Sequence, residues 1–91
     1  MLIEGPGTFE FVLDLGISHE EFASVSSLAP ATVEVFCNDV LVDRVYVANG
    51  ATHTWWSMNP LVRRPEPGDR VKILIVGPAS MRLDWPFKKI A

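Results

Sequence analysis

Alternation of apolar and polar residues, interrupted by turn residues, constrains this chain more than any other feature. From Thr8 to Leu15 every second side chain is a large apolar one, which is typical of a strand that buries one face. The segments with such alternation are 8–15, 32–37, 41–48 and 70–76, with 52–58 and 81–87 as weaker candidates. Many short strands predict an all-β, mainly antiparallel β-sandwich or jelly-roll-like fold, in a single domain over residues 1–91.

Turn residues separate these segments. Pro67-Gly68 fits the central positions of a type II turn, where proline presets φ and glycine accepts a positive φ. Asn49-Gly50 fits a hairpin turn of the primed type, and Gly77-Pro78 ends the strand before it. The turns therefore support the division into short strands.

A short helix is predicted near residues 19–25. Ser18 can cap it, Glu21 completes a capping box, and Ile17 and Phe22 occupy the hydrophobic-staple positions. Pro30 lies soon after and limits its length. We expect this helix to cover an open end of the fold.

The hairpin over residues 32–48 allows two registers. A two-residue turn at Asn38-Asp39 pairs Cys37 with Val40 and places Glu34 opposite Asp43, which is unfavourable for like charges. A longer connection shifts the partner by one, so that Glu34 faces Arg44, Val33 faces Val45 and Phe36 faces Val42. Cross-strand energetics favour the shifted register.

The charges divide along the chain. Residues 1–43 contain eight acidic residues and no lysine or arginine, whereas residues 44–91 contain all eight basic residues and three acidic ones. The two parts carry −8 and +5, although the net charge is only −3. Because the boundary falls inside a hairpin, acidic and basic strands must pair within the fold. We expect any remaining asymmetry to serve self-association.

Composition bears on partners and compartment. Apolar residues make up 48% of only 91 residues, so some must stay on the surface of a monomer, which favours a homodimer or larger oligomer. No apolar run reaches the ~20 residues of a membrane span, and no signal peptide is visible, so we expect a soluble, cytoplasmic protein without membrane contact. The basic pairs Arg63-Arg64 and Lys88-Lys89 are too small for nucleic-acid binding to be expected.

The candidate ligand or interface residues are aromatic or basic. Trp55 and Trp56 are adjacent, so in a strand they point to opposite faces, and one can enter the core while the other faces a partner. Trp85 lies near the C-terminus. Core or interface packing is the main interpretation of the three tryptophans, and an aromatic platform for a sugar or proline is the alternative. Arg63 and Arg64 lie in a proline-bounded segment and could contact an anion or the acidic part of a second copy.

No residue pattern indicates catalysis or metal binding. His19 and His53 lack the spacing of a metal motif, although His53 shares a strand face with Trp55. The single cysteine, Cys37, ends an alternating strand and is expected to be a buried apolar side chain. We therefore expect no catalytic residue, no metal site and no cofactor.

Several short motifs resemble those of galactose-binding-like jelly-roll accessory domains. Asp14-Leu15-Gly16 ends a strand as in those domains, and the hairpin from Val33 to Val42 and the strand from Gly68 to Ile73 are similar to theirs, as is Asp84 in a final strand. The resemblance covers residues 9–85 and implies a jelly roll with a binding role. Such domains are usually longer, and no binding residue is transferred from them.

Together these features predict a non-catalytic binding or protein-interaction module that self-associates, with a carbohydrate or a peptide as further candidate ligands. The alternative is a structural subunit of a larger particle such as a phage or secretion assembly, and a small hydrolase is a distant third.

Overall fold

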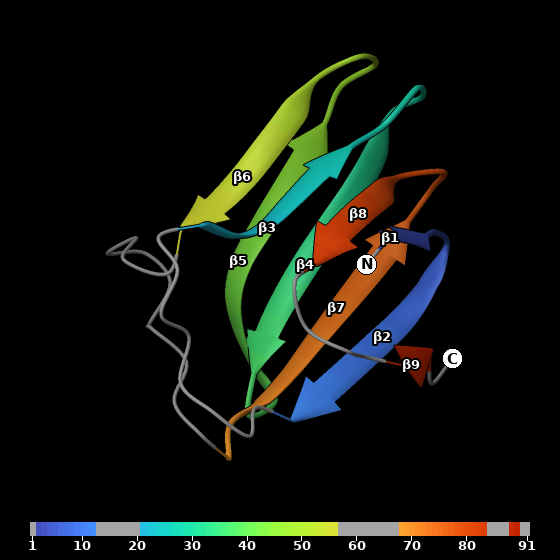
Figure 1. Cartoon of the computed structure of the whole chain (residues 1–91). Helices are drawn as coiled ribbons and strands as arrows, with labels where there is room; N and C mark the ends of the chain where they lie inside the picture. The colour runs from blue at the N-terminus through green and yellow to red at the C-terminus, as the bar shows by residue number, and fades with distance from the viewer. Residues whose placement is uncertain (1, 13–20, 57–67, 84–87, 90–91) are drawn as a thin grey trace.

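Two antiparallel sheets make up the described part of the chain. The computed structural model describes residues 2–12, 21–56, 68–83 and 88–89 (Figure 1). Its strands are β1 (Leu2–Glu4), β2 (Gly7–Val12), β3 (Glu21–Ser26), β4 (Ala31–Cys37), β5 (Val40–Val47), β6 (Thr52–Trp56), β7 (Arg70–Val76), β8 (Ser80–Leu83) and β9 (Lys88–Lys89). The four-stranded sheet has the order β1-β8-β3-β6, and the five-stranded sheet has the order β5-β4-β7-β2-β9. The predicted all-β, antiparallel fold is confirmed.

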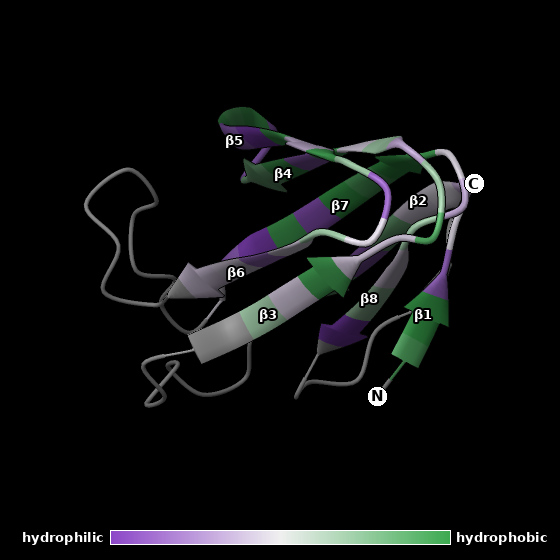
Figure 2. Ribbon diagram, turned by 90° about the horizontal axis from the view of Figure 1, so that it is seen from above, coloured by the Kyte–Doolittle hydropathy of each residue, from purple (hydrophilic) through white to green (hydrophobic). Residues whose placement is uncertain are grey.

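The first eight strands pair in a nested way. β1 pairs with β8, β2 with β7, β3 with β6, and β4 with β5, so the first half of the chain runs back along the second half. Additional pairs, β3 with β8 and β4 with β7, complete the two sheets. The chain therefore resembles one long hairpin rolled into two layers, which Figures 1 and 2 show from two directions.

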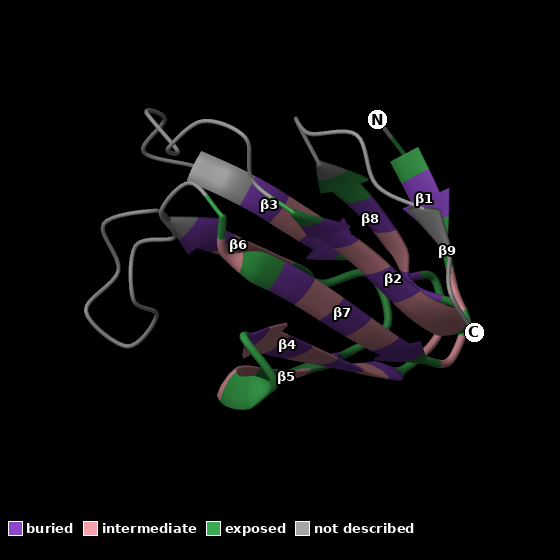
Figure 3. Ribbon diagram, turned by 90° about the horizontal axis from the view of Figure 1, so that it is seen from below, coloured by how far each residue is buried: buried purple, intermediate pink, exposed green. Residues whose placement is uncertain are grey.

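The core lies between the two sheets. Buried and less buried residues alternate along β4 and β7, so each of these strands gives one face to the core (Figure 3). One cluster contains the buried apolar side chains of both sheets: Ile3, Phe9, Phe11, Ala23, Val25, Ala31, Val33, Val35, Val47, Trp55, Val71, Ile73, Ile75, Ala79 and Met81. Alternation in the sequence thus identified the core-facing sides of β2, β4 and β7.

The helix predicted near residues 19–25 is wrong over residues 21–25, which belong to β3; residues 19–20 lie outside the described part. β3 lies between β8 and β6 and pairs with both. Its inward residues Ala23 and Val25 are buried, whereas Ser24 and Ser26 face outward. Two neighbouring strands supply backbone hydrogen bonds along this segment, and such tertiary pairing outweighs local capping signals.

The β4–β5 hairpin has the predicted pairing of Glu34 with Arg44, but the longer connection predicted to produce it is wrong, because a β-bulge shifts the register instead. The turn has two residues, Asn38 and Asp39, whose φ angles of 52° and 67° are those of a type I′ turn, and Cys37 pairs with Val40. The register then shifts between Val35 and Phe36, so Glu34 faces Arg44 as predicted. The predicted partner of Phe36 is wrong, since Phe36 faces Leu41.

The bulge determines where the next residues point. Without it, Asp43 would face outward opposite Glu34. With it, Asp43 lies opposite Val35, whose side chain is buried, and therefore points toward the core.

The turn predicted at Asn49-Gly50 is present but does not form a hairpin. It connects β5 of one sheet to β6 of the other, and only its second residue, Gly50, has a positive φ (75°). The Ala51 N–H donates to the Ala48 carbonyl oxygen at 3.0 Å across this turn. The primed pair is Asn38-Asp39 instead.

Ion pairs join the acidic first part of the chain to the basic second part. Arg44 Nη2 lies 2.8 Å from Glu34 Oε2, Arg70 Nε lies 3.2 Å from Glu10 Oε1, and Lys72 Nζ lies 3.7 Å from Asp39 Oδ1. Each such surface pair contributes at most about 1 kcal/mol. Their main consequence is that charges separated along the sequence neutralise one another across the five-stranded sheet.

None of the described segments is a helix with the length and apolar character needed to cross a membrane.

Candidate functional site

The outer face of the four-stranded sheet carries hydroxyl side chains on three adjacent strands. Strand pairing aligns Ser80, Ser26 and Thr52 in one row, and aligns Arg82, Ser24 and Thr54 in the next. We call the five hydroxyl residues Ser24, Ser26, Thr52, Thr54 and Ser80 the hydroxyl face. Their side chains are short, so a ligand can approach the sheet closely and exchange hydrogen bonds with groups that both donate and accept.

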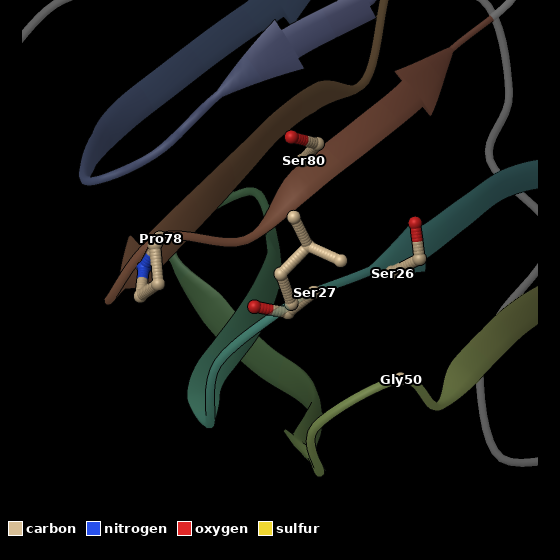
Figure 4. Close-up of a pocket in the computed structure, with 6 residues that line it drawn as sticks. Ser26, Ser27, Gly50, Pro78 and Ser80 are labelled. Atoms are coloured by element: carbon tan, nitrogen blue, oxygen red, sulfur yellow. The ribbon is translucent and has the colours of Figure 1, made fainter.

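Two adjoining pockets lie over this face. The first, of about 290 Å³, is lined by Ser26, Ser27, Leu28, Gly50, Pro78 and Ser80 (Figure 4). The second, of about 240 Å³, is lined by Leu2, Ser24, Val25, Ser26, Thr52, Ser80 and Arg82. Both pockets are lined by Ser26 and Ser80, so they adjoin over β3 and β8, and we call the two pockets together the groove.

Loops hold one end of the groove in place. The Gly50 N–H donates to the Ser27 carbonyl oxygen at 2.8 Å, which joins the β5–β6 turn to the loop after β3. The Ser27 hydroxyl donates to the carbonyl oxygen of Ala29 and accepts the Ala29 N–H at 3.2 Å. Ser27 therefore shapes the loop, and Leu28, which is 90% exposed, gives this end of the groove an apolar rim.

Arg82 gives the groove a positive charge. Of the arginine and lysine side chains that the structure describes, Arg44, Arg70 and Lys72 pair with acids on the five-stranded sheet, whereas Arg82 has no ion pair. Arg82 is exposed on β8 and faces Ser24 and Leu2 on the neighbouring strands. A guanidinium in this setting can take a carboxylate through two parallel hydrogen bonds.

A second polar cluster lies at the edge where the two sheets approach. The buried Trp55 indole donates from Nε1 to Asp43 Oδ2 at 2.7 Å, so a strand of one sheet is tied to a strand of the other. The other carboxylate oxygen of Asp43 accepts the Arg44 N–H at 2.8 Å. The ring of His53 meets that of Trp55 edge-on, with centroids 4.8 Å apart and planes at 77°.

His53 contacts this cluster without a hydrogen bond. Its Nε2 is buried, lacks a hydrogen-bond partner, and lies 3.9 Å from Asp43 Oδ2. The prediction that His53 shares the strand face of Trp55 is confirmed. Because the cluster is centred on the buried Trp55 and its hydrogen bond to Asp43 joins the two sheets, we interpret it as a link between the sheets rather than as a ligand site.

The structure locates only part of the predicted ligand or interface residues. Trp55 is completely buried, which agrees with core packing and leaves no exposed indole face. Trp56 is the last residue of β6, and its backbone pairs with that of Glu21. Its side chain is not among those that the structure describes. Arg63, Arg64 and Trp85 also lie outside the described residues. Cys37 is buried, as predicted.

A weak signal for the groove is present in the sequence. Hydroxyl residues recur at every second position as Ser24 and Ser26 and as Thr52 and Thr54, and Ser80 and Arg82 have the same spacing. Such spacing places each pair on one face of a strand. Only the strand order shows that the three faces lie side by side, so Arg82 was not among the predicted site residues.

Within residues 2–12, 21–56, 68–83 and 88–89, no cluster of three or more histidine, cysteine, aspartate or glutamate residues is arranged to hold a metal ion. Comparisons with protein-family models, with curated proteins and with solved structures found no match.

Proposed function

We propose that this chain is a non-catalytic binding module whose ligand lies in the groove over the hydroxyl face. The observation that carries the proposal is a groove lined by hydroxyl side chains and by Arg82, a cation that forms no ion pair with any described residue. We further propose that the two sheets form a jelly-roll-like sandwich. The nested pairing of β1 to β8 supports this fold, in line with the resemblance to galactose-binding-like domains.

The ligand class that fits best is a carbohydrate carrying a carboxylate. Hydroxyl groups of Ser26 and Ser80 can exchange hydrogen bonds with sugar hydroxyls, and Arg82 can pair with the acid. The Ser24 hydroxyl is already hydrogen-bonded to that of Thr54, at 3.2 Å between the oxygen atoms. Leu2 and Leu28, which are 60% and 90% exposed, can contact the apolar C–H faces of sugar rings. Because no described aromatic side chain lines the groove, we expect weak binding per sugar unit.

Titration with sugar chains of matched length tests this proposal. Backbone amide NMR signals of ¹⁵N-labelled protein are followed as oligogalacturonate or neutral oligogalactose is added. The acidic chain should shift signals from β3, β6 and β8, and Arg82→Gln should remove the preference for the acid. Arg44→Gln is the matched control, because Arg44 is exposed on the other sheet, and it should change nothing.

Three results would contradict the proposal: no shifts at millimolar sugar, shifts away from these strands, or equal effects of the two arginine substitutions. If the protein bound an acidic peptide and neither sugar, the ligand would be a peptide, and the proposal of an acidic carbohydrate would be refuted.

The second candidate function is a structural subunit of a larger particle. Large apolar side chains exposed on the five-stranded sheet, including Tyr46 at 67% and Val76 at 57%, favour it. Electron microscopy of concentrated protein tests it, since a subunit of this kind should form regular assemblies.

A further inference from the structure

We propose that two copies of this chain associate through the outer face of the five-stranded sheet. This surface belongs to the other layer of the fold and is independent of the groove over the hydroxyl face. Apolar side chains lie on its strands β5, β4 and β7, around the Arg44–Glu34 ion pair. We call this group the outer apolar patch: Phe36, Leu41, Tyr46, Leu74 and Val76.

The exposure of this patch is high for a small monomer. Tyr46 is 67% exposed, Val76 57% and Leu41 43%, while Phe36 and Leu74 are half-buried beside them. Lys72 covers part of Phe36, with Nζ 4.8 Å from the ring centroid. The Arg44–Glu34 ion pair lies between Tyr46 and the row that holds Leu41 and Phe36, so apolar and paired charged groups share this face. Exposed apolar surface beside polar groups marks interaction sites, and tyrosine is enriched in protein interfaces.

Charge balance favours a second copy as the partner. The whole chain has a net charge of −3, so two copies repel each other on average. On this face, however, the three described bases Arg44, Arg70 and Lys72 are matched by Glu34, Glu10 and Asp39. Two neutral, internally paired faces can approach without that repulsion, and no excess of either charge calls for a partner of opposite charge.

Strand register provides a two-fold arrangement. Thr32 pairs with Tyr46 on one side and with Val76 on the other, so the two most exposed apolar residues of the patch flank β4 symmetrically. A two-fold axis along β4 therefore places Tyr46 of one copy on the partner's Val76, and the same contact recurs on the other side. The same axis brings the Arg44–Glu34 pairs of the two copies side by side, and each Glu34 carboxylate stays bound to the Arg44 of its own copy. Such reciprocity is the property of an isologous dimer interface.

Complementary charge substitutions test this contact. Sedimentation equilibrium over a wide concentration range should show a monomer–dimer equilibrium for the wild type. Tyr46→Lys alone and Val76→Glu alone should each weaken the dimer by at least about tenfold, because each buries a charge in the interface. An equimolar mixture of the two variants should recover association at least about tenfold over either alone, since one Lys–Glu pair and one native contact form.

Val12→Glu is the matched control. Val12 is 52% exposed on the same side of the same sheet, but it lies on β2, outside the outer apolar patch. It should leave the dimer unchanged, and far-UV circular dichroism should show that all variants keep the fold. A wild type that stays monomeric up to about 1 mM, a Val12→Glu effect equal to that of Val76→Glu, or a mixture that does not recover association would each overturn the proposal.

Discussion

Replacing Asp43 by alanine is expected to destabilise the fold by about 2 kcal/mol. Asp43 Oδ2 accepts the only hydrogen bond described for the Trp55 indole N–H, at 2.7 Å, and Trp55 is fully buried. A hydrogen bond to a charged group contributes about 1.5–3 kcal/mol, and a buried donor left without an acceptor costs about 1–3 kcal/mol. The Asp43 side chain is 23% exposed, so water can replace part of the lost hydrogen bonding. We therefore take a value of about 2 kcal/mol, in the middle of these ranges.

Urea unfolding followed by far-UV circular dichroism measures this loss. For a domain of this size, 2 kcal/mol lowers Tm by roughly 8–16 °C. Glu10→Ala is the matched control, because Glu10 has the same side-chain exposure, 23%, but pairs with Arg70 at the surface, where Arg70 is readily hydrated. We expect Glu10→Ala to cost at most about 1 kcal/mol.

Asp43→Asn separates hydrogen bonding from space filling. Asparagine keeps a side-chain acceptor and nearly the same volume. The free energy of unfolding of Asp43→Asn should therefore lie between that of the wild type and that of Asp43→Ala. The reasoning would be refuted if Asp43→Ala lost no more free energy of unfolding than Glu10→Ala, because the Trp55–Asp43 hydrogen bond would then not join the two sheets energetically.

Two further substitutions test the turn and the close packing of a glycine. Asp39 has a φ of 67°, which glycine adopts without strain and alanine does not. Asp39→Gly should therefore raise the free energy of unfolding by about 0.5 kcal/mol, whereas Asp39→Ala should lower it by about 1 kcal/mol. Urea unfolding measures both values, and equal values would contradict the type I′ assignment. Gly5→Ala should cost about 1–3 kcal/mol, because its Cβ would lie 2.7 Å from the Gly77 carbonyl oxygen and against Ile75; a Tm at or above the wild-type value would show that this contact relaxes freely.

The sequence predicted the core-facing sides of β2, β4 and β7 because apolar alternation is a local signal with a direct structural meaning. Phe9, Phe11, Val33, Val35 and Ile73 are buried as that alternation requires. β3 was missed because its outward residues are serines and its inward ones are small. This segment is a strand because it pairs with β6 and β8, two segments that lie far from it in the sequence.

The β4–β5 hairpin shows how two sound local arguments can both be right. Turn preference required Cys37 to face Val40, and charge pairing required Glu34 to face Arg44. A bulge satisfies both, but no residue type in the strand requires a bulge at Val42. The inward position of Asp43, and hence its bond to Trp55, could not be predicted for the same reason.

The groove could not be predicted from the sequence, because it depends on the order of the strands in the sheet. Ser24, Thr54 and Arg82 become neighbours only when β8, β3 and β6 lie side by side. Sequence reasoning favoured conspicuous residues, such as tryptophans and paired arginines, over serines that alternate on a strand.

The nested pairing of the strands also has a consequence for how the chain folds. The innermost pair, β4 and β5, is closed by two residues, whereas the outermost pair, β1 and β8, encloses almost the whole described chain. The entropic cost of closing a loop rises with the number of residues in the loop. If the innermost pair forms first, each later pair closes only the short segments that remain between it and the pair already formed. The hairpin that carries the bulge is therefore the expected folding nucleus. Because most other pairs are distant in sequence, we expect folding on the slow scale of milliseconds to seconds.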